Sequence, residues 1–490
     1  MKKISILYPK KLGNIAPEIY GHFSEHIGGV FYDGLWVGKD SKIPNINGFR
    51  KEAVEKLRAI NIPVLRWPGG CFAEVYNWRD GIGENRPVRR NWWTKHDGRY
   101  EPNHVGTHEF VELCELIGAK PYFAVNVTSS TPMDAWNWMD YCLSPRGSTT
   151  LALEREKNGH PEPFDIPFWG IGNENWGGGG NMTPESYALE YRRFATLLNY
   201  MGFDVELIAG GANGADYEWT RGLSSLLQSK RDIVNAMSFH FYCSNNWERG
   251  EKDPVNFTDE QWYSLLQDAE RIEDMILRHY GTTMSYCMEE RLKLVIDEWG
   301  CWHAEGSGPS GGCNLYEQQS TMRDALVAAI TMNIFNRHCD KIRMANIAQV
   351  ANNIQSLFLT EGEKFTVTPT YHVFELYKEH QGAEALDTVV SENWDIKDKV
   401  SVSASVKNGK MLITLANYSL YGDTEVSLEL LGATLGGKAQ ARVLHCDDAR
   451  ACNTFENPDR ITPESIELDL AGSITLPRAS VTAISVDVNE

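Results

Sequence analysis

The sequence predicts an α/β protein in which a (β/α)8 TIM barrel is followed by a C-terminal all-β sandwich domain. Eight short apolar runs alternate with longer segments of helical periodicity, as eight βα units require. After about residue 383 the hydrophobic period changes to two, which indicates a separate β domain. A doubly wound open sheet is the structural alternative, but no early G-x-G-x-x-G motif supports it.

The apolar runs are the candidate barrel strands, because parallel strands buried on both faces appear as continuous apolar sequence. They cover residues 19–25, 62–67, 120–127, 166–174, 205–213, 236–243, 293–300 and 342–350. Five candidate helices lie between them, at residues 49–60, 108–119, 185–201, 259–280 and 317–338. In the first of these, Ala53, Val54, Leu57 and Ile60 share one helical face.

The C-terminal segment has the pattern of a β-sandwich. Alternating apolar residues at 402–406 and 411–415 flank Asn408-Gly409, a strong signal for a type I′ hairpin. We therefore assign residues 14–383 to the catalytic barrel and 384–490 to the sandwich. Residues 1–13 are also strand-like and could add a strand to the sandwich.

Composition restricts the partners. The chain has 490 residues, a net charge of −19, 15 tryptophans and 20 tyrosines. The negative charge argues against nucleic acid, anionic membranes and acidic polysaccharides, and the aromatic residues suit stacking on neutral sugars. No apolar stretch is long enough for a signal peptide or a membrane span, and no C-x-x-C pair occurs, so we expect a cytoplasmic protein.

Two predicted strands end in a glutamate flanked by aromatic residues, Glu174 and Glu298. Barrel active sites lie at the C-terminal ends of strands, so these acids are expected to meet. Glycosidic-bond cleavage needs two carboxyl groups in unlike environments, one protonated and one ionised. Asp297 precedes Glu298, and strand alternation should direct only one of the two into the barrel mouth; the sequence does not decide which.

The other predicted strands also end in polar or special residues that packing does not require: His22, Glu25, Arg66, Cys71, Asn126, Asn213, His240, Tyr242 and Gln349. Six motifs occur in order along the chain: Tyr20–His26, Leu65–Phe72, Tyr76–Gly83, Gly172–Trp176, Ser238–Tyr242 and Asp297–Trp299. Together they resemble the motifs of the family 51 glycoside hydrolases, which are retaining α-L-arabinofuranosidases. The tail is more weakly similar to the β-sandwich of that family.

This resemblance implies exo-hydrolysis of terminal non-reducing α-L-arabinofuranosyl residues from arabinose-containing oligosaccharides, as in arabinan degradation and L-arabinose metabolism. It implies double displacement through a covalent glycosyl-enzyme with retention, without a cofactor or a metal. It also implies a homo-oligomer, often a hexamer. The alternative is a related retaining barrel glycosidase that acts on β-xylosides or β-glucans with the same carboxylate pair.

The resemblance also assigns roles to residues. Glu174 would be the general acid/base and Glu298 the nucleophile. Asn173 would bind the sugar 2-hydroxyl, Glu25 the furanose hydroxyls, Tyr242 would orient the nucleophile, and His240 would support the acid/base region. Trp302 and Gln349 match sugar-contacting positions, as does Trp92 or Trp93. Cys71 stands where some members have asparagine, and a thiol is a poor hydrogen-bond partner, so its role is open.

Three further interpretations can be weighed. His22–His26 fits the H-x-x-E-H motif of inverted zinc peptidases, but it follows a strand-like segment and leads into Gly28-Gly29. Gly177–Gly180 precedes a helix start but lacks the Gly-Lys-Ser/Thr ending of a phosphate loop. A non-catalytic sugar-binding protein could use the same aromatics, but two glutamates would be an unnecessary desolvation cost for binding a neutral sugar.

Overall fold

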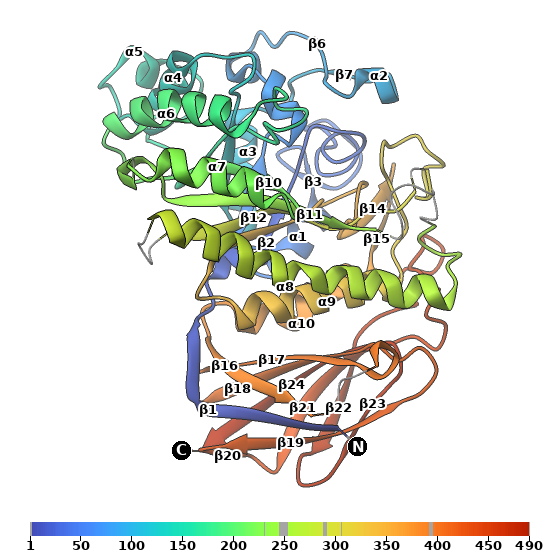
Figure 1. The fold of residues 1–490 in the computed structure, drawn as a ribbon. Coiled ribbons are helices and arrows are strands. Elements are labelled where there is room, and N and C mark those ends of the chain that lie inside the picture. Colours follow the sequence, from blue (N-terminus) through green and yellow to red (C-terminus); the bar gives the residue numbers. More distant parts are fainter. Residues whose placement is uncertain are drawn as a thin grey trace.

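Eight parallel strands close into a barrel, and a β domain packs against one side of it (Figure 1). The computed structural model describes residues 2–229, 231–244, 253–287, 292–304, 306–391 and 395–489. In chain order the barrel strands are β2 (Gly21–Phe23), β5 (Val64–Trp67), β8 (Lys120–Val125), β9 (Phe168–Ile171), β10 (Glu206–Asn213), β11 (Ala236–Cys243), β12 (Lys293–Cys301) and β13 (Ile342–Ala348). The barrel prediction is confirmed, since each predicted apolar run overlaps one of these strands.

A separate apolar cluster fills the inside of the barrel. Seven strands each contribute one buried side chain: Val64, Tyr122, Phe168, Ile208, Ala236, Val295 and Met344. The eighth strand, β2, has Gly21 here, and a Cβ at this position would overlap Val64 and Asn346. The sequence therefore places its smallest residue where two neighbouring strands leave no room.

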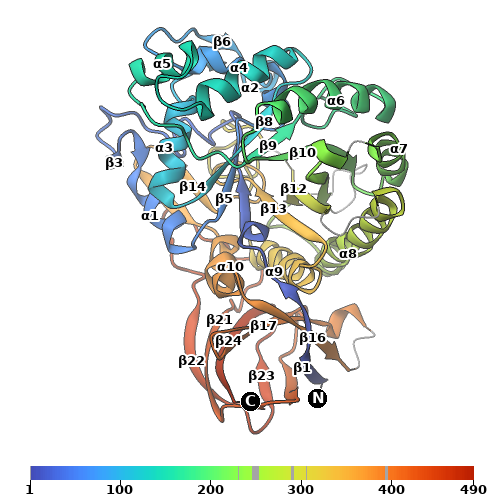
Figure 2. The same cartoon turned by 90° about the vertical axis from the view of Figure 1, so that its left-hand side faces the viewer.

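Helices surround the barrel, as Figure 2 shows from a second direction. They are α1 (Lys51–Ala59), α2 (Thr94–Asp97), α3 (Thr107–Ile117), α4 (Pro132–Leu143), α5 (Thr150–Lys157), α6 (Pro184–Tyr200), α7 (Tyr217–Leu227), α8 (Asp259–Cys287), α9 (Met322–Arg337) and α10 (Pro369–Tyr377). The five predicted helices correspond to α1, α3, α6, α8 and α9. No helix in the described part of the chain is both long and apolar enough to cross a lipid bilayer.

One helix prediction needs correction, and several helices were missed. The prediction that a helix begins at Glu317 is wrong, because Thr321 caps α9 through a capping box with Asp324 and the segment before it is a loop. The sequence analysis also missed α4, although Thr131 and Asp134 form the same capping box there. Helices α2, α5, α7 and α10 were missed as well.

The β domain is one continuous hydrogen-bonded sheet that encloses its own core. Its strands are β1 (Lys2–Asn14), β16 (Glu384–Val390), β17 (Val400–Lys407), β18 (Lys410–Asn417), β19 (Thr424–Leu431), β20 (Thr434–Leu435), β21 (Lys438–Leu444), β22 (Glu464–Asp469), β23 (Ile474–Leu476) and β24 (Ser480–Asn489). The N-terminal β1 pairs with β16 and β19, so the two ends of the chain share this domain (Figure 1). The boundaries 14–383 and 384–490 remain predictions.

The predicted hairpin is confirmed. Asn408 and Gly409 have φ values of 52° and 76°, as a type I′ turn requires, and they join β17 to β18. Apolar residues of these strands pack with residues of β1, β19, β21 and β24 into the second core.

A buried polar network joins the β domain to α9. Asn333 of α9 accepts hydrogen bonds from Ser403 (2.9 Å) and Thr414 (2.9 Å), and it donates one to Ser401 (3.2 Å). These partners lie on β17 and β18, so the barrel and the sheet meet through specific hydrogen bonds.

Smaller elements complete the chain: β3 (Asn45–Ile46) with β4 (Phe49–Arg50), β6 (Arg89–Arg90) with β7 (Tyr100–Glu101), β14 (Phe358–Glu361) with β15 (Lys364–Val367), and the 3-10 turns η1 (Pro17–Tyr20), η2 (Cys71–Val75), η3 (Trp78–Gly81), η4 (Arg231–Ile233), η5 (Lys378–His380) and η6 (Ile396–Asp398).

Candidate active site

A pocket at the C-terminal ends of the barrel strands brings together most of the predicted site residues. Its lining includes Glu25, Cys71, Asn173, Glu174, Tyr242, Glu298, Trp302 and Gln349. His240 lies immediately beside this lining, with its Nδ1 2.9 Å from Glu174 Oε1. Trp93 also lines the pocket, whereas Trp92 is not among the lining residues.

The two glutamates face one another. One carboxylate oxygen of Glu174, one of Glu298 and a ring nitrogen of His240 all lie within 4.8 Å of one another. Carboxyl groups about 5 Å apart have the spacing at which one acts as a nucleophile and the other as an acid/base.

Glu298 is held by two donors. Arg66 donates to its Oε1 at 2.8 Å, and the Tyr242 hydroxyl donates to its Oε2 at 2.8 Å. Burial raises the pKa of Glu298, while His240 and Arg66 act in the opposite direction. The pKa of Glu298 stays raised overall because burial outweighs these charges, while the two donors fix the carboxylate in orientation.

A bulge in β12 explains why Asp297 and Glu298 both point into the barrel. Relative to β11, Ser238 pairs with Val295 but His240 pairs with Glu298, so β12 has one extra residue. Asp297 accepts a hydrogen bond from Tyr122 (3.0 Å) and lies 3.0 Å from His240 Nε2. Glu298 therefore lines the pocket, while Asp297 supports His240.

His240 is surrounded by three acids: Glu174, Glu298 and Asp297. Burial alone would lower its pKa, but the neighbouring charges of Glu298 and Asp297 raise it to about 10. The charged imidazolium form is therefore favoured at neutral pH, with Nδ1 hydrogen-bonded to Glu174 and Nε2 paired with Asp297 by charge.

The loop after β9 gives Glu174 an unusual backbone. Gly172 has φ 87° and Glu174 has φ 43°, both in the left-handed region. The carbonyl of Glu174 accepts hydrogen bonds from Gly177 (2.7 Å) and Gly179 (3.0 Å), which hold this conformation. The side chain of Glu174 is 20% exposed and that of Glu298 is 7% exposed, so Glu174 is the more accessible acid.

The sequence analysis missed Glu74, which anchors this loop. Its Oε1 accepts from the Asn173 backbone (2.7 Å) and from Asn175 Nδ2 (3.1 Å), and its Oε2 accepts from the backbones of Val127 (2.8 Å) and Thr128 (2.7 Å). It lies between the motif segments Leu65–Phe72 and Tyr76–Gly83, in neither of them. A buried carboxylate that accepts four hydrogen bonds fixes the loop that carries the acid/base candidate.

Asn173 has a donor available for a ligand. Arg66 Nη2 donates to its Oδ1 at 2.6 Å, which orients the amide. Its Nδ2 is buried and has no hydrogen-bond partner among the described residues. Such a donor beside Glu174 and Glu298 suits a sugar hydroxyl.

Glu25 forms another part of the wall. Its Oε1 accepts from the Phe72 backbone (2.9 Å) and from Trp93 Nε1 (3.0 Å), and its own N–H donates to Gln349 Oε1 (3.0 Å). Burial raises the pKa of Glu25 to about 7, and Glu298 adds to the rise. Glu25 can therefore accept from, or when protonated donate to, a sugar hydroxyl.

Cys71 packs against the glycine turn after Glu174. A Cβ added at Gly178 would lie 2.7 Å from its sulfur, so the turn passes directly over the thiol. Burial and the surrounding glutamates raise the pKa of Cys71, so it stays a neutral thiol.

Two of the alternative interpretations do not fit. The amides of Gly177, Gly179 and Gly180 donate to backbone carbonyls of the same turn and are not arranged around an anion. His22 lies on strand β2 and His26 in the loop after it, so the H-x-x-E-H segment is not the helix that a zinc peptidase needs.

Two facing glutamates of unlike exposure at the mouth of a parallel barrel, with donors around both, define a glycoside hydrolase. Comparisons with known proteins agree. The alpha-L-arabinofuranosidase 1 domain matches residues 56–260, and the alpha-L-arabinofuranosidase C-terminal domain matches residues 297–480. An intracellular exo-alpha-L-arabinofuranosidase of Bacteroides ovatus is 39% identical over 461 residues, which are 92% of this chain and 88% of that protein.

Solved structures give the same result. The GH51 arabinofuranosidase of Xanthomonas axonopodis pv. citri has a TM-score of 0.93 and 33% identity, covering 99% of this chain and 100% of that one. An arabinose complex of the Thermotoga maritima α-L-arabinofuranosidase has a TM-score of 0.87 and 29% identity, with the same coverage. The chain belongs to the family 51 α-L-arabinofuranosidases.

Proposed function

We propose that the protein is an exo-acting α-L-arabinofuranosidase that removes terminal non-reducing α-L-arabinofuranosyl residues from arabinose-containing oligosaccharides with retention. The observation that supports it most is the placement of one oxygen each of Glu174 and Glu298 within 4.8 Å across a single pocket. That spacing leaves no room for the water that an inverting enzyme places between its carboxylates.

We propose a separate step for each acid, supported by its surroundings. Glu298, oriented by Arg66 and Tyr242, attacks the anomeric carbon and forms the glycosyl-enzyme. Glu174 donates its proton to the leaving oxygen, and then, as a carboxylate, removes a proton from the water that attacks the same carbon. The more exposed position of Glu174 fits both tasks, because the leaving group and the water come from the open side.

The charge of His240 has a role in this cycle. As Glu298 becomes an ester it loses its negative charge, while Glu174 becomes a carboxylate. The imidazolium lies 2.9 Å from Glu174 and 3.4 Å from Glu298, so it stabilises the negative charge on either acid without moving.

Site variants and the product anomer test this function. Glu298→Ala should abolish turnover of aryl α-L-arabinofuranosides. Glu174→Ala should still form the covalent species from activated aryl substrates, and added azide should rescue its breakdown as the glycosyl azide. Asp297→Asn is the matched control: a neighbouring acid that is absent from the pocket lining should show no azide rescue.

Substrate identity has its own measurement. A panel of nitrophenyl glycosides should show turnover of the α-L-arabinofuranoside well above that of the β-xyloside and β-glucoside. A first-formed product of inverted configuration, or natural-substrate turnover by Glu174→Ala near wild type, would contradict the mechanism.

We further propose that the enzyme is a cytoplasmic homo-oligomer that acts on oligosaccharides and not on membranes or nucleic acid. Sedimentation and cell fractionation test these points.

A further inference from the structure

Trp302 links the sugar pocket to the nucleophile. Its ring lines the pocket and packs edge-on against Tyr242, with ring centroids 5.1 Å apart, and against Tyr316 at 5.0 Å. Tyr242 is the residue whose hydroxyl donates to Glu298. A displacement of the Trp302 ring would therefore change the wall of the pocket and the support of Glu298 together.

A buried glutamine forms hydrogen bonds to the backbone of both residues that flank Trp302. Gln318 Nε2 donates to the carbonyl of Cys301 at 3.0 Å, and Gln318 Oε1 accepts from the N–H of His303 at 2.8 Å. Gln318 is 2% exposed and reaches both neighbours of Trp302 with one amide. The backbone N–H of Trp302 donates to the carbonyl of Cys243 at 2.9 Å, so the backbone is held at Trp302 and at both of its neighbours.

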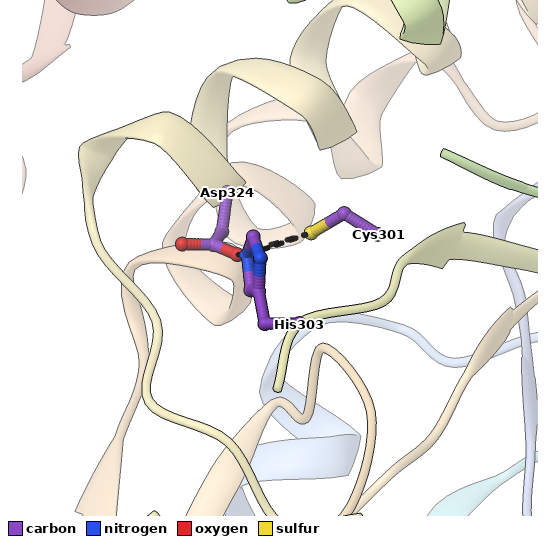
Figure 3. Close-up of side chains that lie close together, drawn as sticks. All are labelled: Cys301, His303 and Asp324. Carbon is purple, nitrogen blue, oxygen red and sulfur yellow. Dashed lines mark hydrogen bonds and ion pairs between the residues drawn. The ribbon is translucent and has the colours of Figure 1, made fainter. Parts of the chain in front are cut away.

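The side chains on either side of Trp302 are anchored as well. Figure 3 shows Cys301, at the end of β12, and His303 converging on Asp324 in the first turn of α9. Asp324 Oδ1 lies 2.7 Å from His303 Nε2 and 3.0 Å from Cys301 Sγ, and all three residues are buried. Its Oδ2 accepts from the Thr321 N–H at 2.7 Å, so Asp324 is itself fixed by the cap of α9.

The tautomer of His303 follows from its surroundings. Its Nδ1 is buried and has no partner in the described part of the chain, whereas Nε2 faces a carboxylate. The proton therefore lies on Nε2 and is donated to Asp324. Although burial disfavours the charged form, His303 and Arg323 lower the pKa of Asp324, which keeps it an anion that can accept.

The same three side chains include a thiol, an imidazole and a carboxylate, so a metal ion has to be considered. Tetrahedral zinc would hold nitrogen and oxygen ligands about 3.4 Å apart and sulfur and oxygen ligands about 3.6 Å apart. The distances here are 2.7 Å and 3.0 Å, which are donor–acceptor distances. Arg323 beside Asp324 adds a positive charge that further disfavours a dication.

We infer that Gln318, His303 and Asp324 are positioning residues that act through Trp302, holding its ring against the sugar and against Tyr242. The inference rests on the proposed glycosidase function, because it is the bound sugar that makes the position of Trp302 matter. None of the three touches the reacting atoms.

Steady-state kinetics of matched variants test the inference. Gln318→Met keeps the side-chain length but removes both hydrogen bonds, and His303→Phe keeps a ring but removes the donor. Each should raise KM and lower kcat/KM for nitrophenyl α-L-arabinofuranoside by roughly 10- to 100-fold, because small displacements in a catalytic pocket have effects of this size. His303→Gln, whose amide nitrogen can take the place of Nε2, should recover most of the loss.

A control separates positioning from folding. Asn336 lies on the same helix α9, is 1% exposed and donates to Ser403 in the β domain. Asn336→Leu should lower the thermal midpoint without changing KM, with rates normalised to the folded fraction from calorimetry. The inference is overturned if Gln318→Met and His303→Phe keep wild-type KM and kcat, or if they lose only folded protein as Asn336→Leu does.

Two further results would decide related points. Stoichiometric zinc in the purified protein, with activity lost to a chelator, would overturn the positioning role in favour of a metal site. If the wild type prefers another glycoside, the proposed substrate is wrong, but the same comparison of variants on that glycoside still tests the role of Trp302. A wild type inactive on every glycoside would overturn both proposals.

Discussion

The loop that carries Asn173 and Glu174 depends on one buried carboxylate, and the substitution Glu74→Gln tests how strongly. Each oxygen of Glu74 accepts two hydrogen bonds, and the residue is completely buried. A glutamine has the same shape but offers one oxygen and one NH2 group. Whichever way the amide turns, the NH2 group faces two N–H donors and leaves both unpartnered.

The cost follows from that count. A buried donor without a partner costs about 1–3 kcal/mol, so two of them cost about 2–6 kcal/mol. The loop can escape part of this cost only by moving away, which displaces Glu174. We therefore expect a lower free energy of unfolding together with a fall in kcat/KM on the order of 10- to 100-fold.

Two assays check this expectation. Urea unfolding gives the change in stability, and kinetics on an arabino-oligosaccharide and on an activated aryl arabinofuranoside give the effect on the site. The oligosaccharide should lose more, because its poor leaving group depends on protonation by Glu174. A Glu74→Gln variant with wild-type stability and wild-type rates on both substrates would refute the reasoning.

Three other substitutions each test one feature of the structure. Tyr242→Phe removes the 2.8 Å hydrogen bond to Glu298. A hydrogen bond to a charged group contributes about 1.5–3 kcal/mol, so kcat/KM should fall roughly 10- to 150-fold. A change under twofold would contradict the role of the hydroxyl. The acidic neighbours of His240 raise its pKa from 6.5 to about 10, so its contribution to stability is complete below pH 6.5 and is lost as the pH rises towards 10. The difference in unfolding midpoint between wild type and His240→Gln should therefore shrink over that range. A constant difference would argue against a charged imidazole. Gly409→Ala places a side chain at φ 76° and should cost about 1 kcal/mol without changing kcat, which thermal unfolding and one rate measurement can check.

Much of the fold could be predicted because its signals are local. A parallel strand buried on both faces must be apolar along its whole length, so the eight strands appear directly in the sequence. Asn408 and Gly409 occupy a turn that few other residues tolerate, and they specify the hairpin. Helix α7 was missed by the sequence analysis although it carries a local signal, an Asp216 side chain that caps its start by accepting from the Trp219 N–H.

The site was predicted less completely. Its acids were visible because a strand that ends in glutamate is unusual, but the choice between Asp297 and Glu298 depends on a bulge that arises from pairing with β11 and β13. Glu74, Arg66 and Trp93 act through partners far away in the chain, such as the bond from Trp93 to Glu25. No local pattern indicates such a partner.

The sequence by itself therefore determined the barrel and the β domain and indicated that strand-end acids form the site, because hydrophobic period, turn chemistry and motif order are written along the chain. Only the tertiary structure decided which neighbouring acid faces the pocket, how Glu74 holds the loop of Glu174, and that Gln318 and Asp324 hold Trp302. These arrangements depend on strand register and on hydrogen bonds between distant segments, which exist only once the barrel has closed.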